Sequence, residues 1–162
     1  MTTLTTFLVF LLALAGAVHT AAHGQTRDAA QRSKPCALLT ADLVKKASAG
    51  HKQSGPLPGP QEVSLGASGL ACEWGDVMLQ IDPFPPAQLD KLRMTDAKNW
   101  ETVSGVGDAA YFHNVQNAVG ELFVRVGGRT FAILMNIPAG TTAAASKPNF
   151  VLLANQIVPK LR

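Results

Sequence analysis

The stretch Glu121–Ile137, ELFVRVGGRTFAILMNI, sets the fold because it predicts a hairpin at the centre of a sheet. Two runs with alternating apolar residues flank Gly127-Gly128, a glycine pair typical of a type I′ two-residue turn. That turn predicts a register that pairs Val124 with Phe131 and Leu122 with Ile133. The opposite face is also partly apolar, through Phe123, Ala132 and Leu134. We therefore expect both faces of this sheet to be covered.

A second hairpin is predicted in LACEWGDVMLQID, residues 70–82. Gly75-Asp76 suits a type II′ turn, in which glycine takes the first central position. The predicted register places apolar partners on one face: Trp74 opposite Val77, Cys72 opposite Leu79 and Leu70 opposite Ile81. The other face receives Glu73, Met78 and Gln80. Cys72 is therefore expected to point into the core.

The two cysteines, Cys36 and Cys72, predict a disulfide. An isolated pair in an exported chain is typical of a structural cross-link, and it would hold the first helix against the second hairpin. On the chain-entropy description such a loop stabilises the fold by roughly 4 kcal/mol. The alternative is a metal site formed with His51 and His113, which no C-x-x-C or H-x-x-x-H spacing supports.

The amino-terminal residues predict export. Residues 7–18 are apolar and uncharged, shorter than the roughly 20 residues of a membrane span but typical of a signal peptide. Ala21, Ala22 and Gly24 allow cleavage after Gly24, or one or two residues earlier, so residues 1–24 are assigned to the signal. An uncleaved signal-anchor or a misassigned start stays the alternative, since no Lys or Arg precedes the apolar run. No lipobox cysteine lies at the cleavage point, and we expect no membrane span after cleavage.

The rest of the chain predicts one α+β domain over residues 36–162, preceded by a flexible lead-in at 25–35. Thr40 suits the N-cap of a short helix that turns Leu39, Leu43 and Val44 inward and stops at Gly50. Residues 51–62 are interpreted as a loop. Further helices are expected at Pro86–Met94, and from Ser146 to about Val158, where Pro159 should end or kink the helix. With a strand at Ala109–His113, the expected fold is a largely antiparallel sheet of about five strands with helices packed on it.

The segment GVGDAAYF, residues 105–112, is interpreted as a turn that enters a strand. A phosphate-binding loop would place its glycines before a helix. Residue types that reach ligands nevertheless gather here, and they form a speculative ligand-binding patch of Trp100, Asp108, Tyr111 and His113. The alternative is that Trp100 covers the core and His113 ends its strand in solvent.

No motif predicts catalysis. G-x-S-x-G and Ser-x-x-Lys are absent, since GASGL at 66–70 has the wrong spacing. Carboxylates such as Glu73, Asp76, Glu101 and Glu121 have no spacing that assigns a pair. The formal charge of +3 is scattered, with no basic run longer than Lys45-Lys46. It supports a mild attraction to anionic envelope surfaces but no nucleic-acid partner. No cofactor or metal is predicted.

Three motifs resemble bacterial exported families of unknown function, many of which are lipoproteins. They are PCALLT at 35–40, Cys72-Glu73-Trp74 in a strand, and VSGVGDAAYF at 103–112. The resemblance spans most of residues 35–160, although the missing lipobox departs from the lipoprotein members. It implies an α+β domain with a helix-to-sheet disulfide, some similar domains being regarded as sensory or binding modules, and it carries over no functional residue.

The expected function is therefore a noncatalytic binding or sensory module of the bacterial cell envelope, periplasmic or secreted, whose partner is a small ligand or an envelope protein. A protein inhibitor or structural partner of an envelope protein is the alternative. A small envelope hydrolase is a third, less favoured interpretation.

Overall fold

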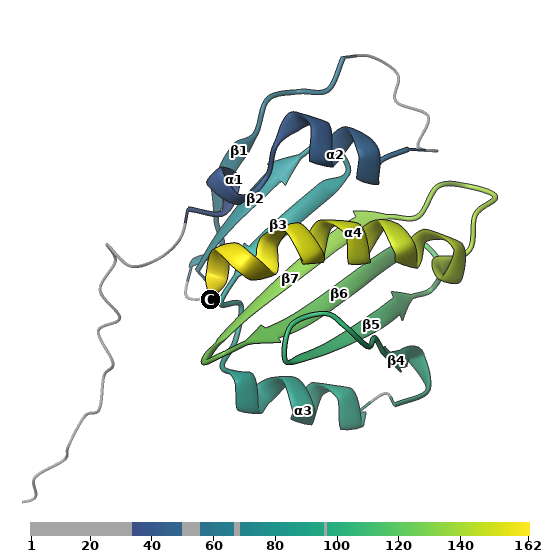
Figure 1. Ribbon diagram of the computed structural model, residues 1–162. Coiled ribbons are helices and arrows are strands. Elements are labelled where there is room, and N and C mark those ends of the chain that lie inside the picture. The colour runs from purple at the N-terminus through teal and green to yellow at the C-terminus, as the bar shows by residue number, and fades with distance from the viewer. Residues whose placement is uncertain (1–33, 50–55, 67–68, 96) are drawn as a thin grey trace, which may run out of the picture.

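An antiparallel sheet of seven strands in the order β1-β2-β3-β7-β6-β5-β4 forms the middle of the molecule (Figure 1). The computed structural model describes residues 34–49, 56–66, 69–95 and 97–162. The predicted signal at 1–24, most of the lead-in, the stop at Gly50 and His51 lie outside these residues. The strands are β1 Gln61–Ser64, β2 Leu70–Trp74, β3 Val77–Ile81, β4 Trp100–Thr102, β5 Ala109–Val115, β6 Val119–Val126 and β7 Arg129–Asn136. The helices are α1 Pro35–Leu38, α2 Ala41–Ala47, α3 Pro86–Thr95, the 3-10 turn η3 Ala97–Asn99 and α4 Ala143–Leu161.

Both predicted hairpins have the expected register. Val124 lies opposite Phe131 and Leu122 opposite Ile133, while Cys72 lies opposite Leu79 and Trp74 opposite Val77. The prediction of a type I′ turn at Gly127-Gly128 is wrong. Of the two glycines only Gly127 has a positive φ, of 58°, whereas a type I′ turn needs a positive φ at both central positions. The predicted register is nevertheless correct, because type I′ and type II′ turns both connect two strands through a two-residue loop.

The prediction of about five strands is wrong, because the sheet gains a short edge strand on each side. β1 begins inside the segment interpreted as a loop, and β4 pairs Trp100 with His113. Both are edge strands, of four and three residues. Neither sequence shows an alternating apolar pattern. Each segment is extended because it forms hydrogen bonds with the neighbouring strand, not because of its own residue types. The α+β class is confirmed.

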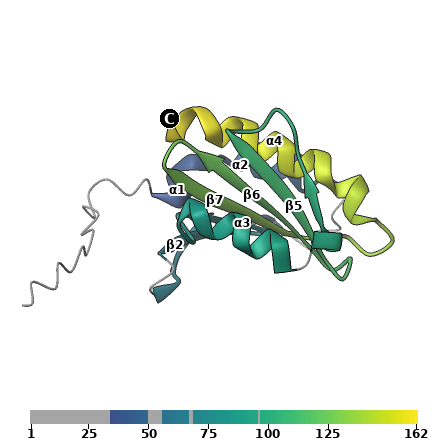
Figure 2. The same cartoon turned by 90° about the horizontal axis from the view of Figure 1, so that it is seen from below.

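Helices lie on both faces of the sheet, as the apolar residues of both faces predict. α1, α2 and α4 pack on one face and α3 on the other, so the domain has three layers (Figure 2). The larger core lies under α4, where Phe150, Leu153 and Ile157 are fully buried. Phe150 meets the ring of Phe112 edge-on, with 5.1 Å between the centroids. Gly120 makes room for both rings, since a Cβ there would lie 2.6 Å from Phe150.

The last helix is longer than predicted at both ends. Thr142 is its N-cap and accepts a hydrogen bond from the backbone N–H of Ala145, so the helix starts before Ser146. It passes Pro159 and ends at Leu161. A proline in the last turn removes one backbone hydrogen bond, and burial of Val158 and Leu161 offsets that loss. No helix within the described residues is long and apolar enough to cross a bilayer.

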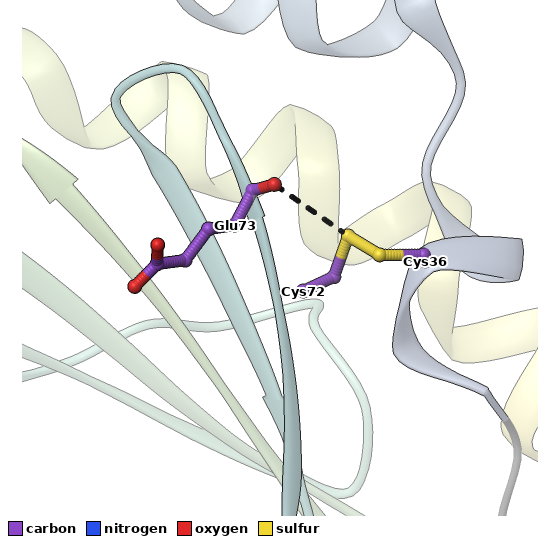
Figure 3. Close-up of a disulfide and its surroundings, with 3 residues drawn as sticks. All are labelled: Cys36, Cys72 and Glu73. Carbon is purple, nitrogen blue, oxygen red and sulfur yellow. Dashed lines mark hydrogen bonds between the residues drawn. A yellow bond between two sulfur atoms is a disulfide. The ribbon is translucent and has the colours of Figure 1, made fainter. Parts of the chain in front are cut away.

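The predicted disulfide is present and joins α1 to β2 (Figure 3). Cys36 and Cys72 are 36 residues apart in sequence, and their Cα atoms are 4.9 Å apart. Cys72 is fully buried and Cys36 half-buried. A metal site that uses both cysteines is therefore excluded, because their sulfurs are bonded to each other.

The short helix predicted after Thr40 is present as α2, which ends at Ala47. Thr40 caps α2, its hydroxyl accepting a hydrogen bond from the backbone N–H of Leu43. Leu39, Leu43 and Val44 are buried.

Candidate functional site

The structure does not bring the four predicted ligand residues together. Asp108 lies in the turn before β5, where its carboxylate accepts a hydrogen bond from the backbone N–H of Gly127 at 2.5 Å. Its own N–H donates to the carbonyl of Arg125. Gly107, with φ of 58°, lies so close to β6 that a Cβ there would be 2.5 Å from the Arg125 carbonyl oxygen. The Asp108 carboxylate therefore holds the turn before β5 against the turn between β6 and β7.

Replacing Asp108 by alanine is expected to lower the free energy of unfolding by about 1 kcal/mol, the contribution of one hydrogen bond to a charged acceptor at the surface. Urea unfolding measures this loss, and amide exchange at Gly127 should accelerate in the same variant. Glu62→Ala, which removes an exposed carboxylate of β1, is the control and should change stability by less than half as much. Equal effects of the two variants would contradict a turn-tying role for Asp108.

Trp100, Tyr111 and His113 do come together, on the α3 side of β4 and β5. The Trp100 ring stacks on His113 with 4.5 Å between centroids, and it packs on Phe123 at 5.2 Å. The Arg93 guanidinium lies 4.7 Å above the Tyr111 ring. His113 Nδ1 is 2.8 Å from Glu121 Oε2 on the neighbouring strand. All three predicted residues are only partly exposed, and their ring faces are occupied by other side chains of the protein.

A row of side chains begins beside this cluster and continues across the sheet. Strand pairing places His113, Glu121, Leu134, Met78 and Glu73 in one row, each opposite the next. Residues on adjacent strands of such a row lie about 5 Å apart. α3 covers the neighbouring row, where Leu89 packs with Phe123 and Ala132, and Leu134 packs against the same cluster. The far part of the row is left without a helix above it.

A hollow of about 370 Å³ lies at this uncovered end. Its lining comes from β2, β3, β6, β7 and the turn between β2 and β3: Glu73, Gly75, Asp76, Val77, Met78, Val119, Leu134, Met135 and Asn136. We call it the sheet hollow. Its volume falls at the lower end of the range of small-molecule sites, roughly 300–1,000 Å³. Glu73 reaches it because successive side chains of a strand alternate between faces; Figure 3 shows its carboxylate on the opposite side of β2 from the disulfide.

The lining of the sheet hollow combines apolar side chains with hydrogen-bond acceptors. Met78, Leu134 and Val119 are partly exposed apolar residues. Met78 Sδ accepts a hydrogen bond from Gln80 Nε2 at 3.3 Å. Asn136 donates to Asp76 Oδ1 at 3.3 Å, which fixes one polar edge. No Lys or Arg lines the hollow, so its polar groups favour ligands that donate hydrogen bonds.

The lining holds no Ser, Thr, Cys or His, so nothing in it can serve as an activated hydroxyl or thiol. In the part of the chain that the structure describes, no three His, Cys, Asp or Glu side chains are grouped to hold a metal ion.

One further polar cluster joins β3 to β7 and is structural. Asp82, with φ of 51°, accepts hydrogen bonds from Nε and Nη2 of Arg129 and from the backbone N–H of Thr130. The Thr130 hydroxyl donates to the carbonyl of Phe84. These bonds hold the segment before α3 against the β6–β7 hairpin.

The sequence does not predict the sheet hollow as a site, although its patterns assign Glu73, Met78 and Leu134 to the correct side of their strands. The missing information is that β3 pairs with β7, with Met78 opposite Leu134. No protein-family model, curated protein or solved structure matches the chain. Its function is therefore inferred from the geometry of the molecule.

Proposed function

We propose that the protein is an exported, noncatalytic domain that binds a small neutral or cationic amphiphile in the sheet hollow. The observation that carries this proposal is the uncovered end of the α3-side face, where an apolar floor meets two carboxylates and an amide. α3 covers only part of that face. Apolar sheet faces are normally buried against other elements of the domain, so an apolar region without such a cover is a candidate for ligand binding.

The lining selects the chemistry of the ligand. Met78 and Leu134 offer an apolar contact, and a methionine side chain adapts to ligands of different shape. Glu73 and Asp76 accept hydrogen bonds and repel anions. The ligand is therefore expected to carry an apolar body with an N–H or O–H donor, and no negative charge.

Export is supported by the apolar amino-terminal segment and by the disulfide, because disulfides form and persist in oxidising compartments outside the cytosol. The periplasm and the surrounding medium both meet this requirement. The resemblance to exported bacterial families points the same way.

The test is a titration with N-phenyl-1-naphthylamine, a neutral probe with two aromatic ring systems and one N–H donor. We expect saturable binding, with amide shifts in nuclear magnetic resonance confined to the strands around the sheet hollow. Met78→Lys should weaken binding at least tenfold, because it places an ammonium group on the apolar floor. Met94→Lys makes the same change on the outside of α3, where Met94 is 69% exposed, and should leave binding unchanged.

A second probe separates specific binding from general hydrophobic adhesion. The sulfonated relative 8-anilinonaphthalene-1-sulfonate has a similar aromatic frame with a negative charge, and it should bind at least tenfold more weakly. Equal binding of the two probes, equal losses in the two methionine variants, or no saturable binding would each overturn the proposal. In that case capture of a stoichiometric envelope protein would favour the inhibitor or structural partner instead.

A further inference from the structure

Charge is divided unequally between the two sides of the sheet. The layer of α1, α2 and α4, with the flanking Lys34 and Arg162, carries six cationic side chains and one carboxylate, Asp42. The other described residues carry five cations and eight carboxylates. Six of the eleven cationic side chains among the described residues therefore lie in one layer, which holds only one of the nine carboxylate side chains.

The most exposed part of this layer is formed by α2 and α4, which lie next to each other on the sheet (Figure 1). Lys45 and Lys46 are exposed on α2, and Lys160 and Arg162 at the end of α4. Lys160 donates a hydrogen bond to the carbonyl of Leu38 at 3.0 Å, which holds its ammonium group at the junction of the helices. Lys147 contributes less positive charge to this surface, because it forms an ion pair with Glu101.

A furrow of about 230 Å³ runs between the two helices. It is lined by Thr40, Asp42, Leu43, Lys46, Leu152, Gln156 and Lys160. Leu152 is 37% exposed and, with Met94 on the other side of the molecule, is one of two large hydrophobic residues exposed among those described. An exposed leucine thus shares the furrow with two lysines and one carboxylate, Asp42.

We propose that this α2–α4 face docks on the surface of a bilayer that contains anionic phospholipid. Cations near such a surface each raise the partition coefficient about fivefold, an effect that fades beyond the Debye length. Leu152 supplies the apolar contact that a lipid surface offers and a soluble polyanion does not. The sheet hollow lies on the opposite face of the sheet, so docking leaves it open. This inference does not depend on the ligand proposed above.

The test is sedimentation with vesicles made of equal parts phosphatidylglycerol and phosphatidylcholine, at low ionic strength, using the oxidised protein. Lys45→Gln with Lys46→Gln should lower the partition coefficient about 25-fold, at roughly fivefold for each charge. The control pair is Lys91→Gln with Lys98→Gln, two exposed lysines of α3 and η3. It makes the same change in net charge and should have less than a threefold effect. Any contribution from the apolar residues 7–18 is common to all variants and does not require lipid charge.

A third variant tests the choice of a lipid partner. Leu152→Ser should weaken vesicle binding severalfold but leave binding to heparin, a soluble polyanion, unchanged. Equal effects of the two lysine pairs, or equal binding to pure phosphatidylcholine vesicles, would overturn the proposal. So would heparin binding through Lys45 and Lys46 without vesicle binding, which would replace the lipid with a soluble polyanion. Binding of N-phenyl-1-naphthylamine should be the same in all three variants.

Discussion

Replacing both cysteines by alanine is expected to lower the free energy of unfolding by about 4 kcal/mol. The disulfide closes a loop between residues 36 positions apart, and the entropy that it removes from the unfolded chain sets this magnitude. Single domains are stable by only about 5–15 kcal/mol, so the variant should lose a large share of its stability. Alanine is preferred to serine because Cys72 is fully buried and a hydroxyl there would lack a partner. Urea unfolding of the oxidised protein and the double variant measures the difference.

Wild-type protein in excess reductant is the control for this experiment. Its stability should fall to within about 1 kcal/mol of the variant's, because both then lack the cross-link and differ only in two thiol groups, of which the one at Cys72 is fully buried. A loss of less than about 1 kcal/mol in the double variant would show that α1 stays on β2 through packing alone. A variant much less stable than the reduced wild type would assign the effect to the lost side chains instead.

Gly107→Ala is expected to cost about 3 kcal/mol, as the sum of a conformational and a steric contribution. The backbone at Gly107 has φ of 58°, a conformation that costs a non-glycine residue about 1–2 kcal/mol. The new Cβ would also lie 2.5 Å from the Arg125 carbonyl oxygen and 2.7 Å from Val124 Cγ1. Neither neighbour can move easily, because Arg125 and Val124 belong to a central strand. Forced overpacking of this kind adds about 1–3 kcal/mol.

Gly105→Ala separates the two contributions. Gly105 also has a positive φ, of 79°, but a Cβ there would meet nothing within 4 Å. It should therefore cost only the conformational part, about 1–2 kcal/mol. Thermal unfolding of both variants measures the difference, and equal losses would show that the close approach to β6 is relieved by a small shift of the turn.

The sequence predicts those parts of the fold that depend on residues close together in the chain. The register of each hairpin follows from two turn residues and the flanking alternation, and this register is enough to place Cys72 in the core. β1 and β4 are not predicted because their residues carry no apolar pattern and become strands only by pairing with β2 and β5. The passage of α4 through Pro159 is not predicted for a related reason, since it depends on burial of Leu161 against elements far away in the sequence.

The candidate site shows the same division. Residue type alone singles out Trp100, Tyr111 and His113, and the fold does place them side by side. What residue type cannot reveal is that Phe123, Arg93 and Glu121 occupy their ring faces and polar atoms. The sheet hollow needs both the hairpin registers and the β3–β7 pairing, and a pairing between residues about 50 positions apart leaves no short-range pattern to find.

The central position of β7 has a consequence for the order in which the chain can fold. The disulfide loop ends at Cys72, so on the proposed export route oxidation can be complete when less than half of the chain has crossed the membrane. β3, in contrast, has one unpaired edge until β7 has been exported, because β3 pairs with β7, with Ile81 opposite Phe131. Loop closure over that distance slows the final step. We therefore expect newly exported chains to pass through an oxidised state with an exposed strand edge, which is the stage at which they are most vulnerable to proteases and to pairing with one another.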